Sequence, residues 1–427
     1  MHIAIIGGGL TGLSAAFDLL KKGHQVTIFE KESYTGGLAS GFHNPEWAWP
    51  LERTYHHFFT NDSDLLSLTH ELGLDASIRI FSPITSVYYQ NHAYPFDTPG
   101  NLLSFPGLPL FDKLRTGAFA AFCKINPFWR PLEHITAKNF AKSFCGPNAY
   151  ETIWKPLLVA KFGPYTDAVA ASWLWARIHK RTTALGYFRG GFTTLISHLA
   201  VAIEKNGGVI RLHTMIQSIE KTANKFSIHM DNKMEIFDAI LVTTPSAIAT
   251  RLMSLPKAYE KKLLSIPHLW AQALILETNK PILEKIYWLN MTDSSFPFVA
   301  VVGHTNMIDK KYYGGHHITY VANYLPDGHP YLSMTKQEII KTFLPYLKRI
   351  NPNFSLNLSL VTSYLFTAPM AQPVHGREYS TKAPTIQTPI PGIYLANLDS
   401  IYPWDRGTNY AVKLGRQAAN EIIMLAR

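Results

Sequence analysis

The first thirty residues constrain the fold of this chain more than any other segment. Residues 2–6 are a short apolar run, and residues 7–12 follow at once as Gly-Gly-Gly-Leu-Thr-Gly, which fits the pattern G-x-G-x-x-G. Apolar residues then recur at helical spacing until two lysines and a glycine at 21–23, a typical helix end. Residues 25–29 read as a second strand, and Glu30 stands at its end. The segment therefore predicts a βαβ unit with a glycine-rich first turn.

Each glycine of this turn has a physical role in holding a dinucleotide. Gly7 permits the tight turn, Gly9 lets the backbone approach a pyrophosphate, and Gly12 lets the helix pack closely on the strand. The helix N-terminus offers free N–H groups and a positive dipole end to phosphates. Glu30 follows Gly12 by about 18 residues, near the spacing of an acid that binds a ribose hydroxyl. We predict a dinucleotide site; the alternative, a glycine-rich turn in an ordinary βαβ unit, does not account for the position of Glu30.

The composition of the 427 residues is that of a globular protein, with 47% hydrophobic and 16% charged residues. Two cysteines, Cys123 and Cys145, offer no disulfide framework or metal cluster and suit a reducing compartment. The N-terminal apolar run is broken by glycines and does not read as a signal peptide, and no apolar run is long enough to span a bilayer. We expect a cytoplasmic protein without a metal site, either free or peripheral to the inner face of the membrane.

The net charge of +10 has three interpretations. It indicates a solvated basic surface, attraction to an anionic substrate or to the pyrophosphate of a dinucleotide, or contact with an anionic membrane surface. Zinc-finger spacing, a basic run of five or more residues and RNA-binding aromatic motifs are all missing from the sequence, so no nucleic-acid partner is expected. The sequence does not indicate an oligomeric state.

The rest of the chain alternates strand and helix signals. We expect strands at 86–89 and 92–94 around a turn at 90–91, a mostly helical stretch over about 109–182 with breaks at Pro127, Pro131, Pro156 and Pro164, and a helix over 192–205 after a glycine pair. Further expected elements are a strand at 209–212, a hairpin of 226–229 and 235–237 around 231–232, strands at 239–244 and 392–396, and a helix over 408–426. Residues 246–380 carry mixed signals and no motif.

Three motifs in chain order resemble those of a known group of flavoenzymes. The first is the N-terminal turn with Glu30, Lys31 and a second glycine pair in residues 35–40, Thr-Gly-Gly-Leu-Ala-Ser. The second runs from 190–192 to 207–212, and the third from 392–396 to 407–412. Together they resemble FAD-dependent amine oxidases, protoporphyrinogen oxidases and phytoene desaturases.

This resemblance implies an α/β fold with two interleaved domains. One is a Rossmann-like FAD-binding domain of the GR2 flavoprotein type, and the other is an α+β substrate domain. The FAD-binding domain would be discontinuous, built from residues 1–80, 186–245 and 385–427. Residues 81–185 and 246–384 would form the substrate-binding domain, with a helical lobe.

The resemblance also implies which residues contact FAD. Gly7, Gly9 and Gly12 would contact the pyrophosphate, and Glu30 would hold the adenosine ribose. Further implied contacts are Leu10, Thr11, Lys31, Gly36, Gly37, Leu38, Ile216, Thr244, Asp399, Asp405, Arg406, Gly407, Thr408 and Asn409. The helix beginning near residue 408 would point its positive dipole end at the flavin. Neither cysteine lies near the C-terminal motif, so non-covalent FAD is expected.

A second resemblance competes with the first. Residues 54–61, Thr-Tyr-His-His-Phe-Phe-Thr-Asn, and the neighbourhood of 94–96 are similar to UDP-galactopyranose mutase, a sugar-nucleotide isomerase that uses reduced flavin. Residues 402–409 instead resemble the oxidases, and the substrate-binding arginines of the mutase find no assigned positions in this chain.

Four residues are candidates for chemistry. His56 or His57 would lie over the flavin as an acid, a base or a hydrogen-bond donor, or both are packing histidines. Lys161, between apolar residues, would anchor a water near the flavin, or it is a surface lysine. Arg406 would bind a phosphate or the flavin edge.

The segment 102–129, rich in Phe, Leu and Pro with interspersed Lys and Arg, has two interpretations. It is either a membrane-contacting or lipid-substrate entrance or an ordinary helical lobe.

These features predict an FAD-dependent oxidoreductase. A small organic substrate, hydrophobic or ring-containing, would give a hydride to flavin N5. The first alternative is a redox-neutral, mutase-like isomerase of a sugar nucleotide that uses reduced FAD. The second is a flavin-binding protein without turnover.

Overall fold

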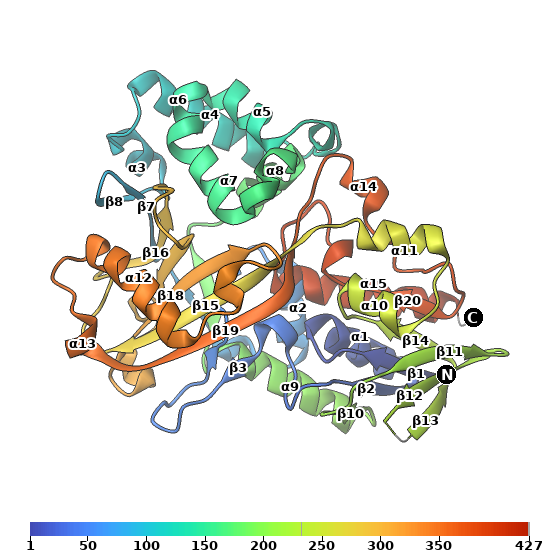
Figure 1. Ribbon diagram of the computed structural model, residues 1–427. Helices are drawn as coiled ribbons and strands as arrows, with labels where there is room; N and C mark the ends of the chain where they lie inside the picture. The colour runs from blue at the N-terminus through green and yellow to red at the C-terminus, as the bar shows by residue number, and fades with distance from the viewer. Residues whose placement is uncertain (232, 426–427) are drawn as a thin grey trace.

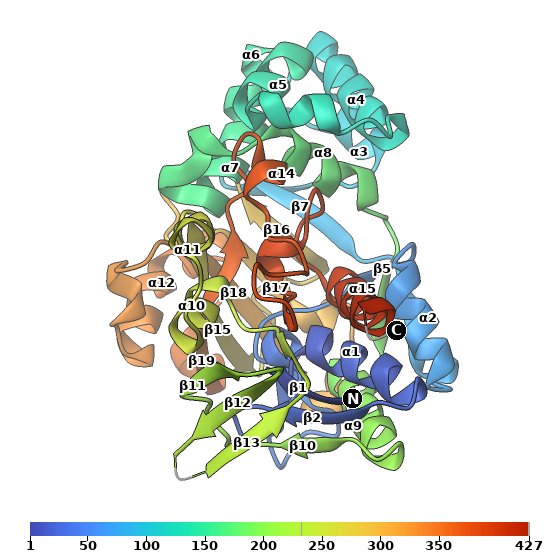
Figure 2. The same cartoon turned by 90° about the vertical axis from the view of Figure 1, so that its right-hand side faces the viewer.

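The computed structural model describes residues 1–231 and 233–425 and has three parts (Figure 1). A parallel sheet with its helices lies at the lower right of this view, and a larger sheet of mainly antiparallel strands lies beside it at the left. A lobe of helices lies at the top, beyond the larger sheet and far from the N-terminus. The view turned by 90° gives the same arrangement (Figure 2).

The parallel sheet takes its strands from three distant parts of the chain. Its order is β10 (Val209–Arg211), β2 (Gln25–Phe29), β1 (His2–Ile6), β14 (Ala239–Val242) and β20 (Ile393–Leu395). Each neighbouring pair is parallel, and β1 lies between β2 and β14. The predicted α/β fold with a Rossmann-like unit is therefore confirmed. The exact division into ranges 1–80, 186–245 and 385–427, against 81–185 and 246–384, stays a prediction.

Side chains alternate between the two faces of this sheet, as the pleat requires. Ile3 and Ile5 face a core shared with helices α1 (Leu10–Lys21), α9 (Phe192–Lys205) and α15 (Thr408–Leu425). Ala4 and Ile6 face the opposite core, which contains a small antiparallel sheet within residues 218–237 and the helix α10 (Ser246–Leu252). Both faces are covered, which is why these strands read as continuous apolar runs rather than as alternating patterns.

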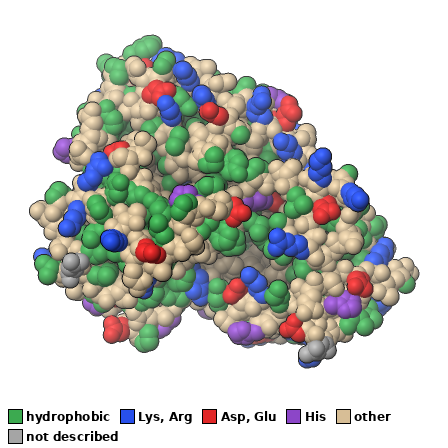
Figure 3. Space-filling view, in the orientation of Figure 1, with side chains coloured by type: hydrophobic (Ala, Val, Ile, Leu, Met, Phe, Trp, Pro, Cys, Tyr) green, Lys and Arg blue, Asp and Glu red, His purple; other side chains and the backbone are tan. Residues whose placement is uncertain are grey.

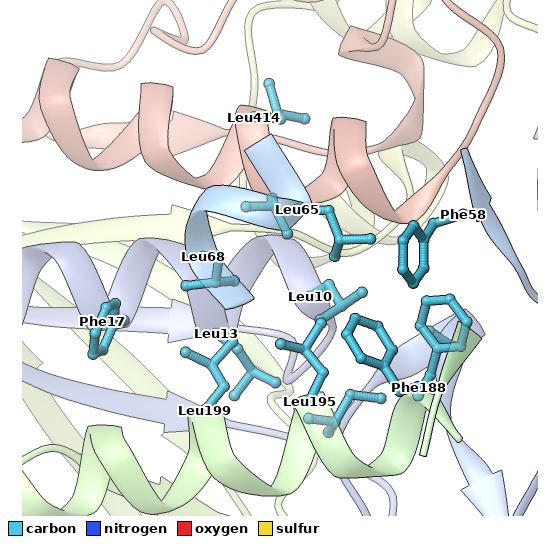
Figure 4. Close-up of a cluster of buried hydrophobic side chains, with 14 of the residues drawn as sticks. Leu10, Leu13, Phe17, Phe58, Leu65, Leu68, Phe188, Leu195, Leu199 and Leu414 are labelled. Atoms are coloured by element: carbon cyan, nitrogen blue, oxygen red, sulfur yellow. The ribbon is translucent and has the colours of Figure 1, made fainter. Parts of the chain in front are cut away.

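Helices from four chain segments meet over the first face of the sheet. Figure 4 shows side chains of α1, α2 (Ser63–Glu71), α9 and α15 pointing toward one another, together with Phe58 and Phe188. The labelled members from the helices are Leu10, Leu13, Phe17, Leu65, Leu68, Leu195, Leu199 and Leu414. This core fixes the N-termini of α1 and α15, which carry the glycine motif and the C-terminal motif.

The larger sheet has seven strands. Their order is β19 (Leu360–Pro373), β15 (His268–Thr278), β18 (His317–Leu325), β17 (Ala300–Gly303), β16 (Ile286–Met291), β7 (Ile84–Tyr89) and β8 (His92–Pro95). Pairing is antiparallel except between β16 and β7. The predicted hairpin of 86–89 and 92–94 is confirmed as β7 and β8, and its turn residues Gln90 and Asn91 both have positive φ.

The helical lobe follows this hairpin. It contains α3 (Pro99–Ser104), α4 (Leu110–Ile125), α5 (Ala137–Cys145), α6 (Pro147–Ala149), α7 (Lys155–Phe162) and α8 (Ala171–Lys180). The predicted helical stretch is confirmed. The break predicted at Pro156 is wrong, because helical backbone continues from residue 147 to 162 through a π-helical turn at Tyr150–Trp154. Pro156 is the second residue of α7, which directly follows this π-helical turn.

The remaining elements are short or flank the two main sheets. They are β3 (Gly41–Phe42), β4 (Leu51–Glu52), β5 (Phe58–Phe59), β6 (Ile78–Phe81), β9 (Leu185–Phe188), β11 (Ser218–Thr222), β12 (Lys225–Met230), β13 (Lys233–Phe237), α10 (Ser246–Leu252), α11 (Lys257–Leu264), α12 (Lys336–Ile350), α13 (Leu356–Ser359) and α14 (Tyr379–Lys382). The predicted hairpin of 226–229 and 235–237 is β12 and β13, although its turn residue 232 lies outside the described residues, as does residue 426 of the predicted last helix. The strand predicted to end at 244 ends at 242.

Candidate functional site

The glycine-rich turn between β1 and α1 is shaped by contacts that only glycine permits. Gly7 has a φ of +111°, and its N–H donates to the Phe29 carbonyl over 2.8 Å. A Cβ at Gly12 would lie 2.2 Å from the Gly7 carbonyl oxygen, so a side chain there would push the helix off the strand. At Gly9, by contrast, a Cβ would meet only Gly37 Cα, at 3.9 Å. Packing does not require glycine at position 9, whereas the close approach of a ligand to this backbone would.

The second glycine pair lies directly against the first turn. The Gly36 N–H donates to the Gly8 carbonyl over 2.8 Å, and Gly9 and Gly36 form a parallel bridge. Gly36 and Gly37 both have positive φ, and a Cβ at Gly36 would lie 2.6 Å from Ile196 Cδ1. The two glycine loops therefore contact each other through backbone atoms. The predicted cofactor contacts at 7–12 and 36–38 lie together where these loops cross.

Glu30 has a structural role that the sequence did not reveal. Its Oε2 accepts the Gly8 N–H over 2.8 Å, and its Oε1 accepts the Glu32 N–H over 2.9 Å. The carboxylate therefore stabilises the glycine-rich turn of residues 7–12 through its backbone. Each carboxylate oxygen has a further lone pair, so acceptance of a ribose hydroxyl remains open to it. Lys31 is exposed, with its ammonium 3.4 Å from Glu32.

Two further predicted contacts lie on either side of this turn. Ile216 is buried in the core behind the sheet, and the neighbouring Thr214 N–H donates to the Glu30 carbonyl over 2.8 Å. Thr244 follows β14, and its hydroxyl is buried without a hydrogen-bond partner in the described part of the chain. A buried hydroxyl without a partner is costly, and a polar group of a bound cofactor would satisfy it.

The segment between β20 and α15, residues 396–407, which we call the C-terminal turn, is held by side chains at each end. The Asp399 carboxylate is 1% exposed; its Oδ1 lies 2.6 Å from His268 Nε2, and its Oδ2 accepts the Ser246 hydroxyl. Asn409 Oδ1 accepts the Leu65 N–H at the start of α2, over 3.0 Å. These two side chains are therefore occupied in fixing the turn, and their predicted contacts with FAD stay predictions.

Asp405 is the centre of the polar cluster at the junction of the C-terminal turn, the lobe and the larger sheet. It accepts hydrogen bonds from Lys161 Nζ (3.0 Å), Arg177 Nη1 (3.0 Å), Trp173 Nε1 (3.1 Å) and Gln372 Nε2 (3.2 Å). Burial disfavours its charged form, but Lys161 and Arg177 outweigh that cost and hold the pKa of Asp405 well below its ordinary value. Burial also lowers the pKa of Lys161, against the pull of Asp405. The interpretation of Lys161 as a surface lysine is wrong, since only 9% of it is exposed.

Arg406 lies beside this cluster and contacts a pair of tyrosines. It donates to the Tyr324 hydroxyl, which lies 3.3 Å from the Tyr55 hydroxyl, and to the Ala371 carbonyl over 3.4 Å. Burial alone would raise the pKa of Tyr324, but Arg406 and Lys161 lower it to about 8. The pKa of Tyr55 is raised well above its ordinary value by burial and by Tyr324. The Tyr324 phenol therefore loses its proton more readily than an ordinary tyrosine, whereas the Tyr55 phenol loses it less readily.

The two histidines of the predicted catalytic set are held as neutral rings. His56 Nδ1 lies 2.7 Å from the Thr54 carbonyl, and His57 Nδ1 lies 3.0 Å from the Tyr287 hydroxyl. Burial lowers the pKa of His56 to about 4 and that of His57 to about 3. Near pH 7 neither ring carries the extra proton that a general acid needs, so a hydrogen-bonding role suits them better than an acidic one.

The structure brings Lys161 and Arg406 together around Asp405, and it adds residues that the sequence did not single out. The additions are Tyr55, Trp173, Arg177, Tyr324 and Gln372. They come from the loop after β4, from α8 and from strands β18 and β19, and no spacing in the sequence links them. His375 lies at the same junction; it is buried, and neither ring nitrogen has a partner among the described residues.

Two general features of residues 1–231 and 233–425 bear on function. No group of three or more His, Cys, Asp or Glu side chains is placed to hold a metal ion in this part of the chain. Over the same residues, no helix is both long and apolar enough to cross a membrane.

The parallel sheet, together with the glycine turns of residues 7–12 and 36–37, which we call the glycine cradle, is typical of α/β proteins that bind a dinucleotide. The sequence model of the flavin-containing amine oxidoreductases matches residues 10–423, so the chain belongs to this family and uses a flavin cofactor. The predicted resemblance to this group is confirmed.

Individual proteins show how far the similarity reaches. The chain is 22% identical to coproporphyrinogen III oxidase of Staphylococcus aureus (strain NCTC 8325 / PS 47) over 289 residues, which is 58% of this chain and 61% of that protein. It therefore spans less than two thirds of this relative. Its structure is similar to that of an Exiguobacterium sp. 255-15 protein assigned provisionally as a protoporphyrinogen oxidase (TM-score 0.79, 17% identity, 99% of both chains). It is also similar to reduced UDP-galactopyranose mutase (TM-score 0.75, 15% identity, 99% of this chain and 96% of that one). At these identities the structures show the fold alone.

Proposed function

We propose that the protein is an FAD-dependent oxidoreductase that removes a hydride from an organic substrate with a hydrophobic or ring-shaped body. The observation that carries this proposal is the placement of the glycine cradle and the Asp405 cluster at the starts of two packed helices. The glycine cradle lies at the start of α1, and the Asp405 cluster lies at the start of α15, which packs so closely on α1 that a Cβ at Gly415 would lie 2.3 Å from the Thr11 carbonyl oxygen.

FAD fits the residues around the cradle. The unfilled side of Gly9, the unpartnered Thr244 hydroxyl and the free N-terminus of α1 all suit a dinucleotide whose phosphates approach the backbone. Both cysteines are buried inside the lobe, and burial raises the pKa of each thiol to about 12. Neither thiol is a nucleophile near the cradle, which supports non-covalent binding.

The chain supplies orientation and proton handling, while bound FAD supplies the acceptor for a hydride. Asp405 fixes Lys161 and Arg177 in place, and Arg406 fixes Tyr324. Tyr324, with its pKa of about 8, is the group best suited to accept a proton from a substrate N–H or O–H. His56 and His57, as neutral rings, would position the substrate or ring rather than protonate it.

The charge of the cluster bears on the substrate. Lys161, Arg177 and Arg406 carry three positive charges, and Asp405 is the one carboxylate that contacts them among the described residues. A cationic amine would meet repulsion here, whereas a substrate with carboxylate or phosphate groups would be attracted. This excess of positive charge also favours the second candidate, redox-neutral chemistry on a sugar nucleotide with reduced FAD.

An anaerobic titration of the purified holoprotein distinguishes the candidates. Flavin bands at about 450 nm should bleach when a substrate gives up a hydride. We expect bleaching with an anionic porphyrinogen and little with putrescine, which is a dication. If the oxidised protein bleaches with none of the porphyrinogen, isoprenoid and amine probes, and a UDP-sugar perturbs only the dithionite-reduced spectrum, the mutase-like function is favoured. Bound flavin that responds to none of these would indicate a flavin-binding protein without turnover.

A further inference from the structure

The solvent-facing side of α4 is apolar, the reverse of an ordinary surface helix. Leu110, Leu114, Ala118, Ala121 and Ile125 repeat every three or four residues and are all exposed. The opposite side, which is buried in the lobe, carries Asp112, Thr116, Phe119 and Cys123. A surface helix of a globular protein normally buries its apolar stripe and turns its polar residues to water.

The apolar stripe is part of a wider surface, which we call the lobe face. Leu110, Phe111, Leu114, Ile125 and Phe128 are between 56% and 79% exposed. Phe144 of α5 extends the face, because its ring stacks on Phe122 of α4 at 5.2 Å, and both rings are exposed. Exposed apolar side chains gathered on one end of a molecule mark an interaction surface. Figure 3 shows hydrophobic side chains at the upper end of the molecule, over the lobe, together with basic and some acidic ones.

The exposed charged side chains of residues 99–145 are all basic. Residues 99–145 contain six Lys or Arg and two Asp or Glu, and both acids, Asp112 and Glu133, are buried. Lys138 is paired with Asp167, and Lys124 donates to backbone carbonyls at the end of α8. The other four cations, Lys113, Arg115, Arg130 and Lys142, have no carboxylate within ion-pair distance among the described residues.

Two of these cations flank the apolar stripe on α4 itself. Lys113 Nζ donates to the Leu103 carbonyl over 2.8 Å, and the Arg115 guanidinium donates to the carbonyls of Ser143 and Phe144. Bonds to carbonyl oxygens leave the positive charge uncompensated. Arg130 extends the charged rim, and its guanidinium lies 5.2 Å from the Trp129 ring centre.

We propose that the lobe face docks on an anionic lipid surface, with α4 lying in the plane of the interface. An exposed apolar stripe rimmed by cations is the pattern by which a helix inserts among headgroups and meets acidic lipids. Acidic side chains exposed on this face would be repelled by such a surface, and it has none between residues 99 and 145. The proposal concerns binding alone and does not depend on the reaction that the protein catalyses.

Vesicle flotation of the holoprotein tests this directly. The probes are vesicles of phosphatidylcholine alone and of phosphatidylcholine with phosphatidylglycerol, each at low and at high salt. We expect partitioning into the anionic vesicles to exceed that into the neutral ones by about tenfold or more at low salt, and to fall steeply at high salt. Equal partitioning into both, or none into either, would overturn the proposal.

Matched variants separate the lobe face from general stickiness. Leu114→Ser, Ile125→Ser and Phe128→Ser combined should reduce partitioning about tenfold or more. Met215→Ser, Met234→Ser and Leu264→Ser combined, at exposed apolar positions away from the lobe, should leave it unchanged. If the first variant does not fold, as judged by circular dichroism and flavin content, Arg130→Glu with Lys142→Glu gives the same test through charge. If the wild-type protein is a dimer that does not bind vesicles, and the lobe-face variant is a monomer, the lobe face binds a second copy of the chain instead.

Discussion

Lys161 Nζ lies 3.0 Å from Asp405 Oδ2, and this contact joins the helical lobe to the C-terminal turn across 244 residues of sequence. Arg177 Nη1 lies at the same distance from the same oxygen, so one carboxylate holds two cations from two helices of the lobe. The side chains of Lys161 and Asp405 are only 11% and 13% exposed. This carboxylate therefore links α7 and α8 of the lobe to the segment just before α15.

Replacement of Asp405 by Asn should destabilise the protein strongly. The change leaves the nearly buried Lys161 and the partly exposed Arg177, whose side chain is 38% exposed, without their counter-charge. Loss of the partner of a buried charge typically costs about 3–5 kcal/mol in free energy of unfolding, and Lys161 carries most of this expectation. Asp167→Asn is the matched control, because Asp167 also accepts from a lysine at 3.0 Å but on the surface, where a pair contributes about 0–1 kcal/mol. Urea unfolding of both variants measures the difference. Equal losses of free energy of unfolding in the two variants would show that the contacts of Asp405 contribute no more than a surface ion pair.

The glycine cradle predicts opposite outcomes for two alanine substitutions. Gly9→Ala should fold normally and lose FAD affinity about a hundredfold or more, because its Cβ meets no protein atom closer than 3.9 Å but occupies the side of the backbone that the cofactor approaches. Gly12→Ala should lose stability even without FAD, since its Cβ would lie 2.2 Å from a carbonyl oxygen. Gly117→Ala, inside α4, is the control for a harmless added methyl group. Thermal unfolding of the apoprotein and FAD titration separate the two effects, and an unaffected FAD affinity in Gly9→Ala would argue against the cradle.

Because of the buried carboxyl group of Glu52, we expect the free energy of unfolding to decline between acid and neutral pH. It is fully buried, and its carboxylate caps α9 through the Phe192 N–H at 2.7 Å while accepting from Tyr187. Burial raises the pKa of Glu52 from 4.5 to about 7. The folded protein therefore keeps a proton that the unfolded chain releases, so stability falls as pH rises from about 4.5 to about 7, by up to about 3 kcal/mol. Urea midpoints across this range measure the decline, and Glu52→Gln should remove that contribution; an unchanged slope in this variant would assign the decline to other groups.

Tyr324 predicts a basic limb in the rate of substrate oxidation. Arg406 and Lys161 lower the pKa of this phenol to about 8 against its burial, so the deprotonated form gains population as pH rises past that value. The rate of flavin bleaching should rise through an apparent pKa near 8, and Tyr324→Phe should abolish this limb. Tyr55→Phe should keep the limb but move it upward, because the hydrogen bond from Tyr55 helps to lower the pKa of Tyr324. Persistence of the limb in Tyr324→Phe would exclude this phenol as the proton acceptor.

The sequence predicts well where local pattern and local chemistry coincide. The βαβ unit of residues 2–29, the helix at 192–205 and the long C-terminal helix follow from apolar periodicity and glycine placement. The hairpin at β7 and β8 follows from a polar turn whose two residues adopt positive φ. These features depend on residues that are neighbours in the chain.

The rest depends on residues that are distant in the chain. Nothing near Lys161 in sequence indicates that Asp405 would lie beside it, which is why the surface interpretation of this lysine failed. The seven-stranded sheet pairs β7 with β16 across roughly two hundred residues, and such pairing has no local signature. The break predicted at Pro156 failed for a different reason, because a π-helical turn carries the helix into it.

The identity and attachment of the cofactor test the account most directly. The purified protein should be yellow, and acid precipitation should release flavin into the supernatant, where mass spectrometry should find FAD at one molecule per chain. Release of the flavin is expected because both cysteine thiols are buried in the lobe, with the pKa of each raised to about 12. A colourless protein that takes up no added FAD would contradict the dinucleotide site, and flavin that stays with the precipitated chain would contradict non-covalent binding.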